Sequence, residues 1–377
     1  MSVQPLYANR RVRIMPSICM LIKRKLKGPG TVLAQKNTDV SPHDVLGHYK
    51  LAVGFTKVNL ATELNVSATD VPKYLKKAVG QTIFKGELLA FKKGLFGKSE
   101  IIAQTDGIFE SLDPKTGVAS FKLIPKDIVL TSGVFGVVEA VDHAKGEVTI
   151  KTMMTEVYGV MGTGNEKEGF INILSGPGDL VNKDAVTEAH RGQIIVAGSL
   201  MMEATIKKAL SCSVSGIICG ALNMDDYLSM AVSLNPLKRV GTEIGISIIA
   251  TEGFGIIPMG DDFYDLLKKN SGRFAVIQGN LGRLLLPSDD PNSILSCRKV
   301  GLPLKEALGA RPELSVEEIK TGSKVRLITS PFMGAQGEVL AIDNTPTKLE
   351  SGILTYLITV GTRVKKIRVP FSNVEII

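Results

Sequence analysis

The sequence predicts a multidomain chain of mixed class, α+β and α/β, with a β-rich N-terminal region, a central parallel α/β domain and a small C-terminal β-barrel. Three observations predict this. The chain has 377 residues, and because a domain holds about 100–200 residues, two to four domains are expected. A strand–turn–strand pattern recurs in the first half. Apolar runs alternate with helical patterns in the middle, and 44% hydrophobic residues suffice for several cores.

The β-rich region, residues 31–152, contains an internal repeat. Residues 107–122 align without gaps on residues 136–151, with five of 16 positions identical. Each copy predicts a strand, an Asp-x-x-x-Gly turn and a second strand, because Asp caps its own turn and Gly accepts a positive φ. Ahead of this pair, residues 61–77 have the apolar spacing of a short helical insertion. The repeat therefore predicts tandem hairpins with a structural role.

Part of this region resembles a known fold. The segment Gly80–Ala90 followed by Ile101–Phe109 is similar to the barrel-sandwich hybrid of biotinyl and lipoyl carriers. In those carriers a hairpin tip presents a modified lysine, and Phe96 stands near that place here. Three lysines lie nearby without the flanking pattern of the carriers: Lys92, Lys93 and Lys98. The resemblance therefore implies a barrel-sandwich-hybrid-like scaffold without the modified lysine.

Residues 153–290 have the pattern of an α/β domain. Apolar runs of strand length alternate with segments of helical spacing. Strands that are apolar on both faces predict a parallel sheet covered by helices on two sides. Residues 291–319 are expected to be a linker. The predicted strands are 193–197, 216–219, 244–250 and 273–277, and the predicted helices are 201–210, 224–232 and 261–269.

The carboxyl ends of these strands form a candidate ligand site, because open α/β sheets bind ligands there. Glycines at the strand ends would let a ligand approach the backbone, and one acid is placed to act on it. The same small residues also suit short strand-to-helix turns, so both interpretations stay open. The candidate residues are Gly198, Ser199, Gly220, Glu252, Gly253 and Gly255.

Catalytic and metal-binding motifs are scarce. The sequence has no Gly-x-Ser-x-Gly and no Walker motif, its four His are dispersed, and its four Cys lack C-x2-C spacing. We therefore expect no catalytic residue, no metal and no cofactor. Free cysteines suit the reducing cytoplasm. Because no stretch reaches the roughly 18 apolar residues of a membrane span, we expect a soluble cytoplasmic protein without a membrane partner.

The net charge of +8 is concentrated at the two ends of the chain. Residues 1–30 hold seven basic residues and no acid, and residues 320–377 hold eight basic residues and four acids, which leaves −3 for residues 31–319. Residues 1–30 are either a free basic arm or the first strands of a barrel with the basic residues facing water. The basic ends indicate an anionic partner.

Residues 320–377 carry the most specific motif. Residues 324–343 contain a strand, Ser330-Pro331-Phe332, then Gly334 and Gly337 before an apolar alternation, and they resemble the KOW motif of NusG-type transcription factors and several ribosomal proteins. The resemblance implies an SH3-like barrel that binds RNA, ribosomal protein or RNA polymerase. Its basic residues would neutralise phosphates, with a solvated barrel surface as the alternative. These residues are Lys324, Arg326, Arg363, Lys365, Lys366 and Arg368.

The complete arrangement resembles a group of prokaryotic multidomain proteins, and this resemblance bears on fold rather than on an activity. The leading hypothesis is a non-enzymatic cytoplasmic factor that contacts RNA, a ribonucleoprotein such as the ribosome, or RNA polymerase through its basic ends, together with a protein partner. The alternative is a small-molecule-binding or catalytic α/β protein whose β domains are assembly scaffolds.

Overall fold

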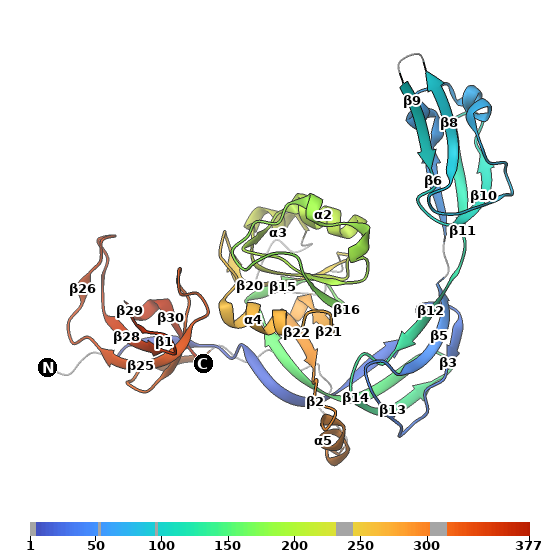
Figure 1. Cartoon of the computed structure of the whole chain (residues 1–377). Coiled ribbons are helices and arrows are strands. Elements are labelled where there is room, and N and C mark those ends of the chain that lie inside the picture. The colour runs from blue at the N-terminus through green and yellow to red at the C-terminus, as the bar shows by residue number, and fades with distance from the viewer. Residues whose placement is uncertain (1–4, 52–53, 95–96, 231–243, 302–314) are drawn as a thin grey trace.

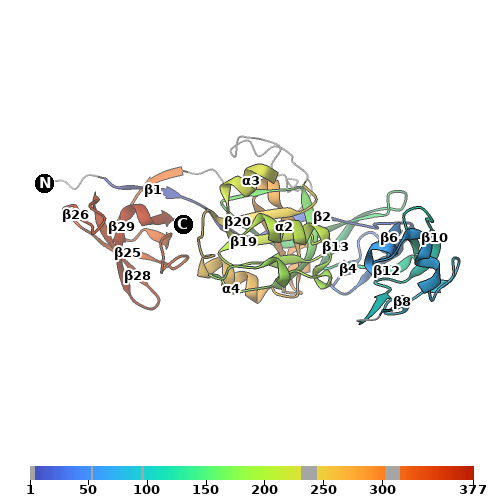
Figure 2. The same cartoon turned by 90° about the horizontal axis from the view of Figure 1, so that it is seen from above.

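The chain is a β-rich, multidomain protein, which the computed structural model describes over residues 5–51, 54–94, 97–230, 244–301 and 315–377. Its strands form several separate groups along an elongated molecule (Figures 1 and 2). We name four parts in the order in which they follow each other in space. They are the terminal unit (residues 5–10 and 315–377), the central domain (residues 159–287), the junction domain (residues 14–51 and 124–158, with the helix 293–299) and the projecting unit. The terminal unit lies at one end and the projecting unit, residues 54–123, at the other.

Two long antiparallel strands, β2 (Ile14–Lys25) and β14 (Glu147–Tyr158), form the base of the junction domain. β14 also pairs with β13 (Gly136–Asp142) at its start and with β22 (Arg283–Pro287) at its end. One sheet therefore continues into the central domain, and the expected boundary after residue 152 falls inside β14. The other strands of this domain are β3 (Gly30–Val32), β4 (Asp39–Val40), β5 (Val45–Leu51) and β12 (Lys126–Thr131).

The projecting unit is an insertion between β5 and β12, and it has a core of its own around Phe109 and Phe121. The helical insertion expected over residues 61–77 is present as α1 (Leu60–Leu64) and a 3-10 helix. The Asn59 side chain caps α1 by accepting a hydrogen bond from the Thr62 N–H. The remaining elements are the 3-10 helix Ala68–Tyr74 and strands β6 (Phe55–Asn59), β7 (Thr82–Ile83), β8 (Leu88–Gly94), β9 (Gly97–Ile102), β10 (Gly107–Leu112) and β11 (Val118–Leu123).

Both copies of the sequence repeat form antiparallel hairpins, β10–β11 in the projecting unit and β13–β14 in the junction domain. In each hairpin the register shifts at the repeated glutamate, Glu110 or Glu139. The turn glycines Gly117 and Gly146 have φ of +68° and +62°, a conformation that favours glycine. The repeat therefore encodes one turn and one β-bulge, used in two different parts of the molecule.

Three neighbouring strands of the central domain, β17, β19 and β20, pair in parallel, as their apolar runs predict. The fourth predicted strand is antiparallel to both of its neighbours, because β21 turns directly into β22 and the two form a hairpin. The sheet is therefore mixed. The elements are β15 (Met161–Thr163), β16 (Glu166–Ile173), β17 (Ile194–Val196), β18 (Leu200–Met201), α2 (Glu203–Ser211), β19 (Gly216–Leu222), α3 (Met224–Met230), β20 (Ser247–Phe254), α4 (Asp261–Lys269), β21 (Phe274–Gln278) and the 3-10 helices Lys183–Ala185, Glu188–His190 and Gly279–Leu281. The helix α5 (Ser293–Lys299) packs against β13 and β14 of the junction domain.

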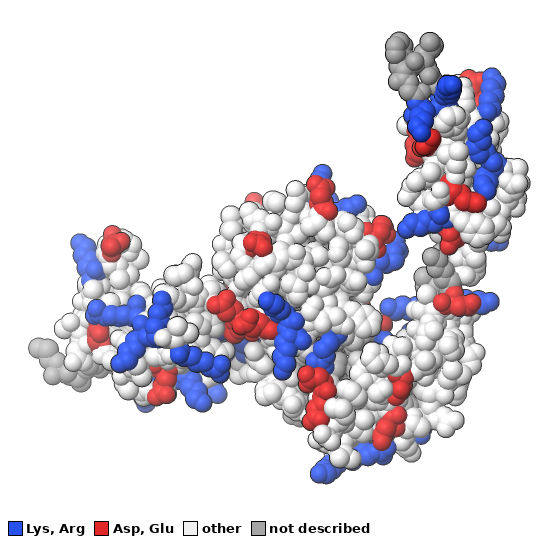
Figure 3. All heavy atoms as spheres, in the orientation of Figure 1, with Lys and Arg blue, Asp and Glu red and all other residues white. Residues whose placement is uncertain are grey.

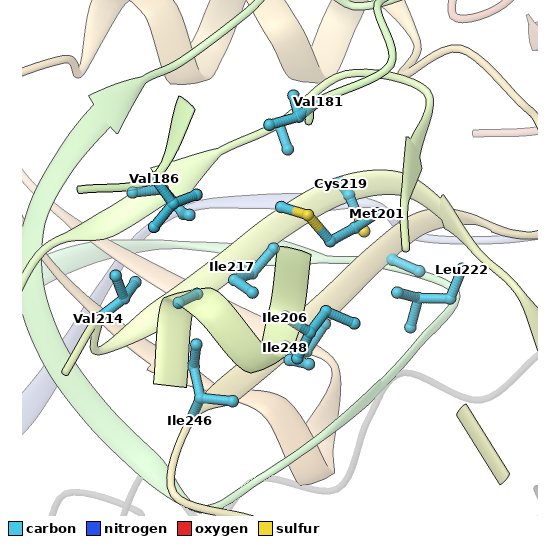
Figure 4. Packing of buried hydrophobic residues seen from close by; sticks show 14 of the residues in the cluster. Val181, Val186, Met201, Ile206, Val214, Ile217, Cys219, Leu222, Ile246 and Ile248 are labelled. Carbon is cyan, nitrogen blue, oxygen red and sulfur yellow. The ribbon is translucent and has the colours of Figure 1, made fainter. Parts of the chain in front are cut away.

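Buried side chains pack on both faces of this sheet. On one face, Ile206 of α2 packs against Ile217 and Ile248 of the strands (Figure 4). On the other face, Phe263 of α4 belongs to a second cluster of buried residues. Cys219 is fully buried among aliphatic side chains, and this burial raises the pKa of its thiol to about 12, as expected for a core residue rather than a reactive one.

The N-terminal strand β1 (Tyr7–Arg10) belongs to the terminal unit, where it pairs with β23 (Ser315–Glu318) and lies parallel to β30 (Val374–Ile376). The first and the last strand of the described chain therefore lie in the same unit (Figure 1). The expectation of a free arm over residues 1–30 is wrong, because this segment contains the paired strands β1 and β2. The expected linker 291–319 contains the helix α5 and the strand β23. The other elements are β24 (Lys324–Leu327), β25 (Gln336–Ile342), β26 (Thr347–Lys348), β27 (Leu354–Thr355), β28 (Leu357–Thr362), β29 (Lys366–Pro370) and the 3-10 helix Phe371–Asn373.

Candidate functional site

A fully buried guanidinium joins the terminal unit to the central domain. Arg326 of β24 has a side chain that is 0% exposed, and it lies between Glu252 of β20 and Asp262 of α4. Its Nε donates to Asp262 Oδ2 at 2.8 Å, and its Nη2 donates to Glu252 Oε1 at 2.9 Å. A third carboxylate, that of Glu375, accepts from Nη1 at 3.3 Å. Carboxylates on several sides offset the large cost of burying this charge.

Arg13, between β1 and β2, joins the same cluster. Its Nε donates to Glu375 Oε1 at 2.8 Å and its Nη1 to the Thr251 carbonyl at 2.6 Å. The guanidinium carbons of Arg13 and Arg326 each lie 5.5 Å from the centre of the Phe263 ring, within the range of a cation–π contact. We define the buried ionic cluster as Arg13, Glu252, Asp262, Arg326 and Glu375.

The cluster keeps Arg326 charged. Burial alone lowers the pKa of Arg326, but the hydrogen bonds and negative charges of Asp262 and Glu252 outweigh burial and raise this pKa above its ordinary value. The members of the cluster come from four distant parts of the chain, and no spacing in the sequence relates them. The sequence placed Glu252 at a strand end, Asp262 in a pair of acids at the start of a helix and Arg326 in a basic segment, but none of these patterns indicates that the three are partners.

Two predicted site residues therefore have a structural role. Arg326 was expected to neutralise a phosphate, but it is buried and its donors are used inside the protein. Glu252 was expected to act on a ligand, but its side chain is 3% exposed and also accepts a hydrogen bond from the Gly260 N–H at 3.1 Å. The phosphate expectation is therefore wrong for Arg326. Docking of the terminal unit holds Glu252 in ion pairs with Arg326 and Arg13, and Glu252 also lines a cavity between the two parts.

The loop with the KOW-like motif takes part in the same contact. The Asp261 N–H at the start of α4 donates to the Met333 carbonyl at 3.2 Å. Gly334 has a φ of +85°, and a Cβ placed on it would lie 2.5 Å from the Asp261 nitrogen. Gly334 is therefore required by the close approach of two backbones.

Most of the predicted ligand-binding strand ends are covered by the protein itself. A Cβ on Gly198 would lie 2.0 Å from the carbonyl oxygen of Asp179, and one on Gly220 would lie 2.2 Å from a carbonyl oxygen of the loop before α4. The Ser199 N–H donates to Asp179 at 2.8 Å. These backbone contacts fill the space that the ligand hypothesis needs. The remaining candidates have φ of +122° and +111° and shape the backbone at the end of β20: Gly253 and Gly255.

Four predicted phosphate-binding residues lie together and are exposed on the hairpin of β28 and β29, which we call the basic hairpin. Residues 357–370 contain no acid and no aromatic residue. Figure 3 shows Lys and Arg gathered on the surface of the terminal unit. Lys324 is also exposed, but β25 and β28 lie between its strand and β29. The residues of the basic hairpin are Arg363, Lys365, Lys366 and Arg368.

The four cations of the basic hairpin differ in their partners. Lys365 Nζ lies 4.7 Å from the centre of the Phe332 ring, and Arg368 forms an ion pair with Asp343. Within the part of the chain that the structure describes, Arg363 and Lys366 form no ion pair. The Thr362 hydroxyl donates to the Lys365 carbonyl at 2.8 Å and holds the turn closed. The hairpin therefore presents two uncompensated charges on an ordered turn.

The lysines of the carrier-like tip have other roles where the structure describes them. Lys92 Nζ donates to the carbonyls of Leu64 and Asn65, both at 3.0 Å, and so caps the end of α1. Lys98 pairs with Glu100 at 2.8 Å, and Lys93 is exposed. Phe96 lies outside the described residues.

Among the described residues, no group of three or more His, Cys, Asp or Glu side chains could hold a metal ion. The described helices include none that is long and apolar enough to cross a membrane. No family model and no curated protein matches the sequence.

Proposed function

We propose that this protein is a non-enzymatic factor that binds the phosphate backbone of structured RNA through its basic hairpin. The observation that carries this proposal is a cluster of four exposed cations on a hairpin without a single acid. Contacts of this kind give sequence-independent, salt-sensitive affinity for phosphates. RNA in a ribosome or in a transcription complex presents the same phosphates.

The absence of aromatic residues from residues 357–370 favours structured RNA over a single strand. Proteins that bind single strands stack bases on aromatic side chains, whereas RNA helices are recognised by their shape and backbone.

The fold that we propose agrees with this role. We infer a KOW-type, SH3-like barrel for the terminal unit, an α/β domain in the centre, and a barrel-sandwich-hybrid-like fold without a modified lysine for the N-terminal β region.

Fluorescence anisotropy of the full chain with a labelled RNA hairpin, measured over a range of salt concentrations, tests this function. Replacing all four cations of the basic hairpin by Gln should weaken binding and reduce the slope of log affinity against log salt by roughly 2 to 4, because each phosphate contact contributes about 0.9 to that slope. Among single variants, Arg363→Gln and Lys366→Gln should weaken binding most, since neither forms an ion pair or a ring contact with the described residues, whereas Arg368 pairs with Asp343 and Lys365 lies over the Phe332 ring.

A matched control removes four exposed, ion-paired lysines elsewhere. Gln at these positions lowers the net charge by the same amount and should leave the salt slope unchanged. Equal losses in both variants, or binding that does not respond to salt, would refute the proposal. A DNA duplex of the same sequence in parallel shows whether the preference is for RNA. The control positions are Lys73, Lys98, Lys145 and Lys207.

A further inference from the structure

A cavity of about 460 Å³ lies between the terminal unit and the central domain, next to the buried ionic cluster. This volume falls within the range of small-molecule sites. The terminal unit contributes Ile328, Met333 and Phe371 to its lining, and the central domain contributes Val160 and Ile257. The charged residues Arg13, Glu252 and Glu375 of the buried ionic cluster also line it, and they pair with one another or with Arg326. The cavity therefore combines apolar walls from two parts of the molecule with one charged end.

Arg11 also lines this cavity and is the least satisfied guanidinium near the cluster. Its only ion pair is with Glu375 Oε2, at 3.8 Å, and its side chain forms no hydrogen bond with the described residues. The other oxygen of Glu375 already accepts from Arg13 and Arg326. Three guanidinium groups thus converge on one carboxylate, and Arg11 keeps its donors free at the cavity.

The electrostatics around Arg11 agree with this geometry. Burial and the positive charge of Arg13 lower the pKa of Arg11, and the charges of Glu375 and Glu252 offset this only in part. An anion placed in the cavity would accept charge-assisted hydrogen bonds from the planar fork of Arg11, the geometry in which arginine binds carboxylates and phosphates.

We propose that this cavity binds a small organic anion, with its carboxylate or phosphate on Arg11 and its apolar body against Ile257, Ile328 and Met333. The ligand would contact both parts of the molecule and so strengthen the docking of the terminal unit. This site is separate from the basic hairpin, and it does not depend on RNA binding.

The test uses the full chain with methyl-labelled methionines, because the Met333 methyl group reports on the cavity. Benzoate and phenyl phosphate should shift the Met333 NMR signal and raise the unfolding temperature by mass action. Benzamide, which has the same ring but no charge, should bind at least about tenfold more weakly, a difference of about 1.4 kcal/mol. The tighter of the two anions identifies the preferred headgroup.

Arg11→Gln should weaken the binding of the preferred anion by at least about tenfold. Arg10→Gln is the matched control, since Arg10 is the next residue, is exposed and pairs with Glu317 at 2.8 Å, and it should bind as the original chain does. Arg11→Lys keeps the positive charge but lacks the planar pair of donors, so its affinity for the anion should lie between those of Arg11→Gln and the original chain. The proposal is overturned if neither anion shifts the Met333 signal, if benzamide binds as tightly as benzoate, or if Arg10→Gln and Arg11→Gln have equal effects.

Discussion

Arg326 is one of the largest fully buried side chains of the described protein, and its charge is balanced by carboxylates from two parts of the molecule. Its neighbour Lys324, two residues earlier on the same strand, is exposed. The two cations belong to one basic stretch of sequence but face different surroundings. A buried ion pair of this kind contributes little net stability compared with apolar packing, yet loss of one partner is costly.

Replacing Arg326 by Met should therefore lower the free energy of unfolding by about 3–5 kcal/mol, because Asp262 would lose its ion-pair partner and Glu252 would keep only the longer pair with Arg13, at 3.6 Å. Urea unfolding followed by circular dichroism measures this change. The control Lys324→Met, on the same strand, should change stability by no more than about 0.5 kcal/mol. Similar midpoints for both variants would show that the buried ionic cluster does not hold the two parts together.

At the scale of elements, β1 shows how a short N-terminal segment completes a distant unit. Ala8 is buried in the same core as Val325 and Ile358, and the Leu6 carbonyl accepts a hydrogen bond from Ile319. β1 pairs with two strands that follow it by more than 300 residues. The terminal unit therefore cannot be complete when residues 320–377 are taken alone.

Buried and exposed side chains alternate along this segment, so substitutions at two adjacent residues should destabilise the terminal unit by very different amounts. Leu6→Ala should destabilise the terminal unit by about 2–5 kcal/mol, because it removes a side chain that is only 7% exposed. Tyr7→Ala removes a side chain of a residue that is 54% exposed and should have a much smaller effect. Hydrogen exchange of the β24 and β30 amides measures both. Equal protection in the two variants would argue against a structural role for this segment.

The bulged hairpin is an element that the sequence predicts well. The aligned copies at residues 107 and 136 give the same turn and the same bulge. A third segment with weaker similarity to the repeat begins at Gly337. The register of β25 shifts at Leu340, the position equivalent to the repeated glutamate. Local residues decide this geometry, since the turn glycine and its capping Asp act within a few residues. Which strands lie beside each hairpin depends on the rest of the chain.

At the scale of the whole molecule, the parts are nested rather than arranged in sequence order. The described chain begins in the terminal unit, passes through β2 to the junction domain and leaves it for the projecting unit. It then returns to the junction domain through β12, β13 and β14, and continues through the central domain to the terminal unit (Figure 1). In the described chain, the projecting unit and the central domain are each built from one continuous stretch, whereas the junction domain and the terminal unit combine segments that lie far apart in the sequence. The core of the projecting unit is separate from that of the junction domain.

This separation predicts that the projecting unit can be removed without unfolding the rest. Leu51 and Lys126 face each other in the antiparallel pair β5–β12, so a two-residue Asn-Gly turn in place of residues 52–125 can close the gap. The shortened chain should keep its unfolding midpoint, measured by thermal circular dichroism. The fragment 54–124 should fold alone. A shortened chain that fails to fold would show that the two cores are coupled.

The β-rich, multidomain character, the repeated hairpins and the parallel run of β17, β19 and β20 could be predicted from the sequence. Each of these follows from periodicity or turn chemistry within a few residues. Only the tertiary structure decided that β1 completes the terminal unit, that β21 is antiparallel, and that Glu252 and Arg326 are partners. Those outcomes depend on contacts between segments that lie tens to hundreds of residues apart. The free energy of packing these segments together decides which strands and side chains pair, and no local sequence pattern reports it.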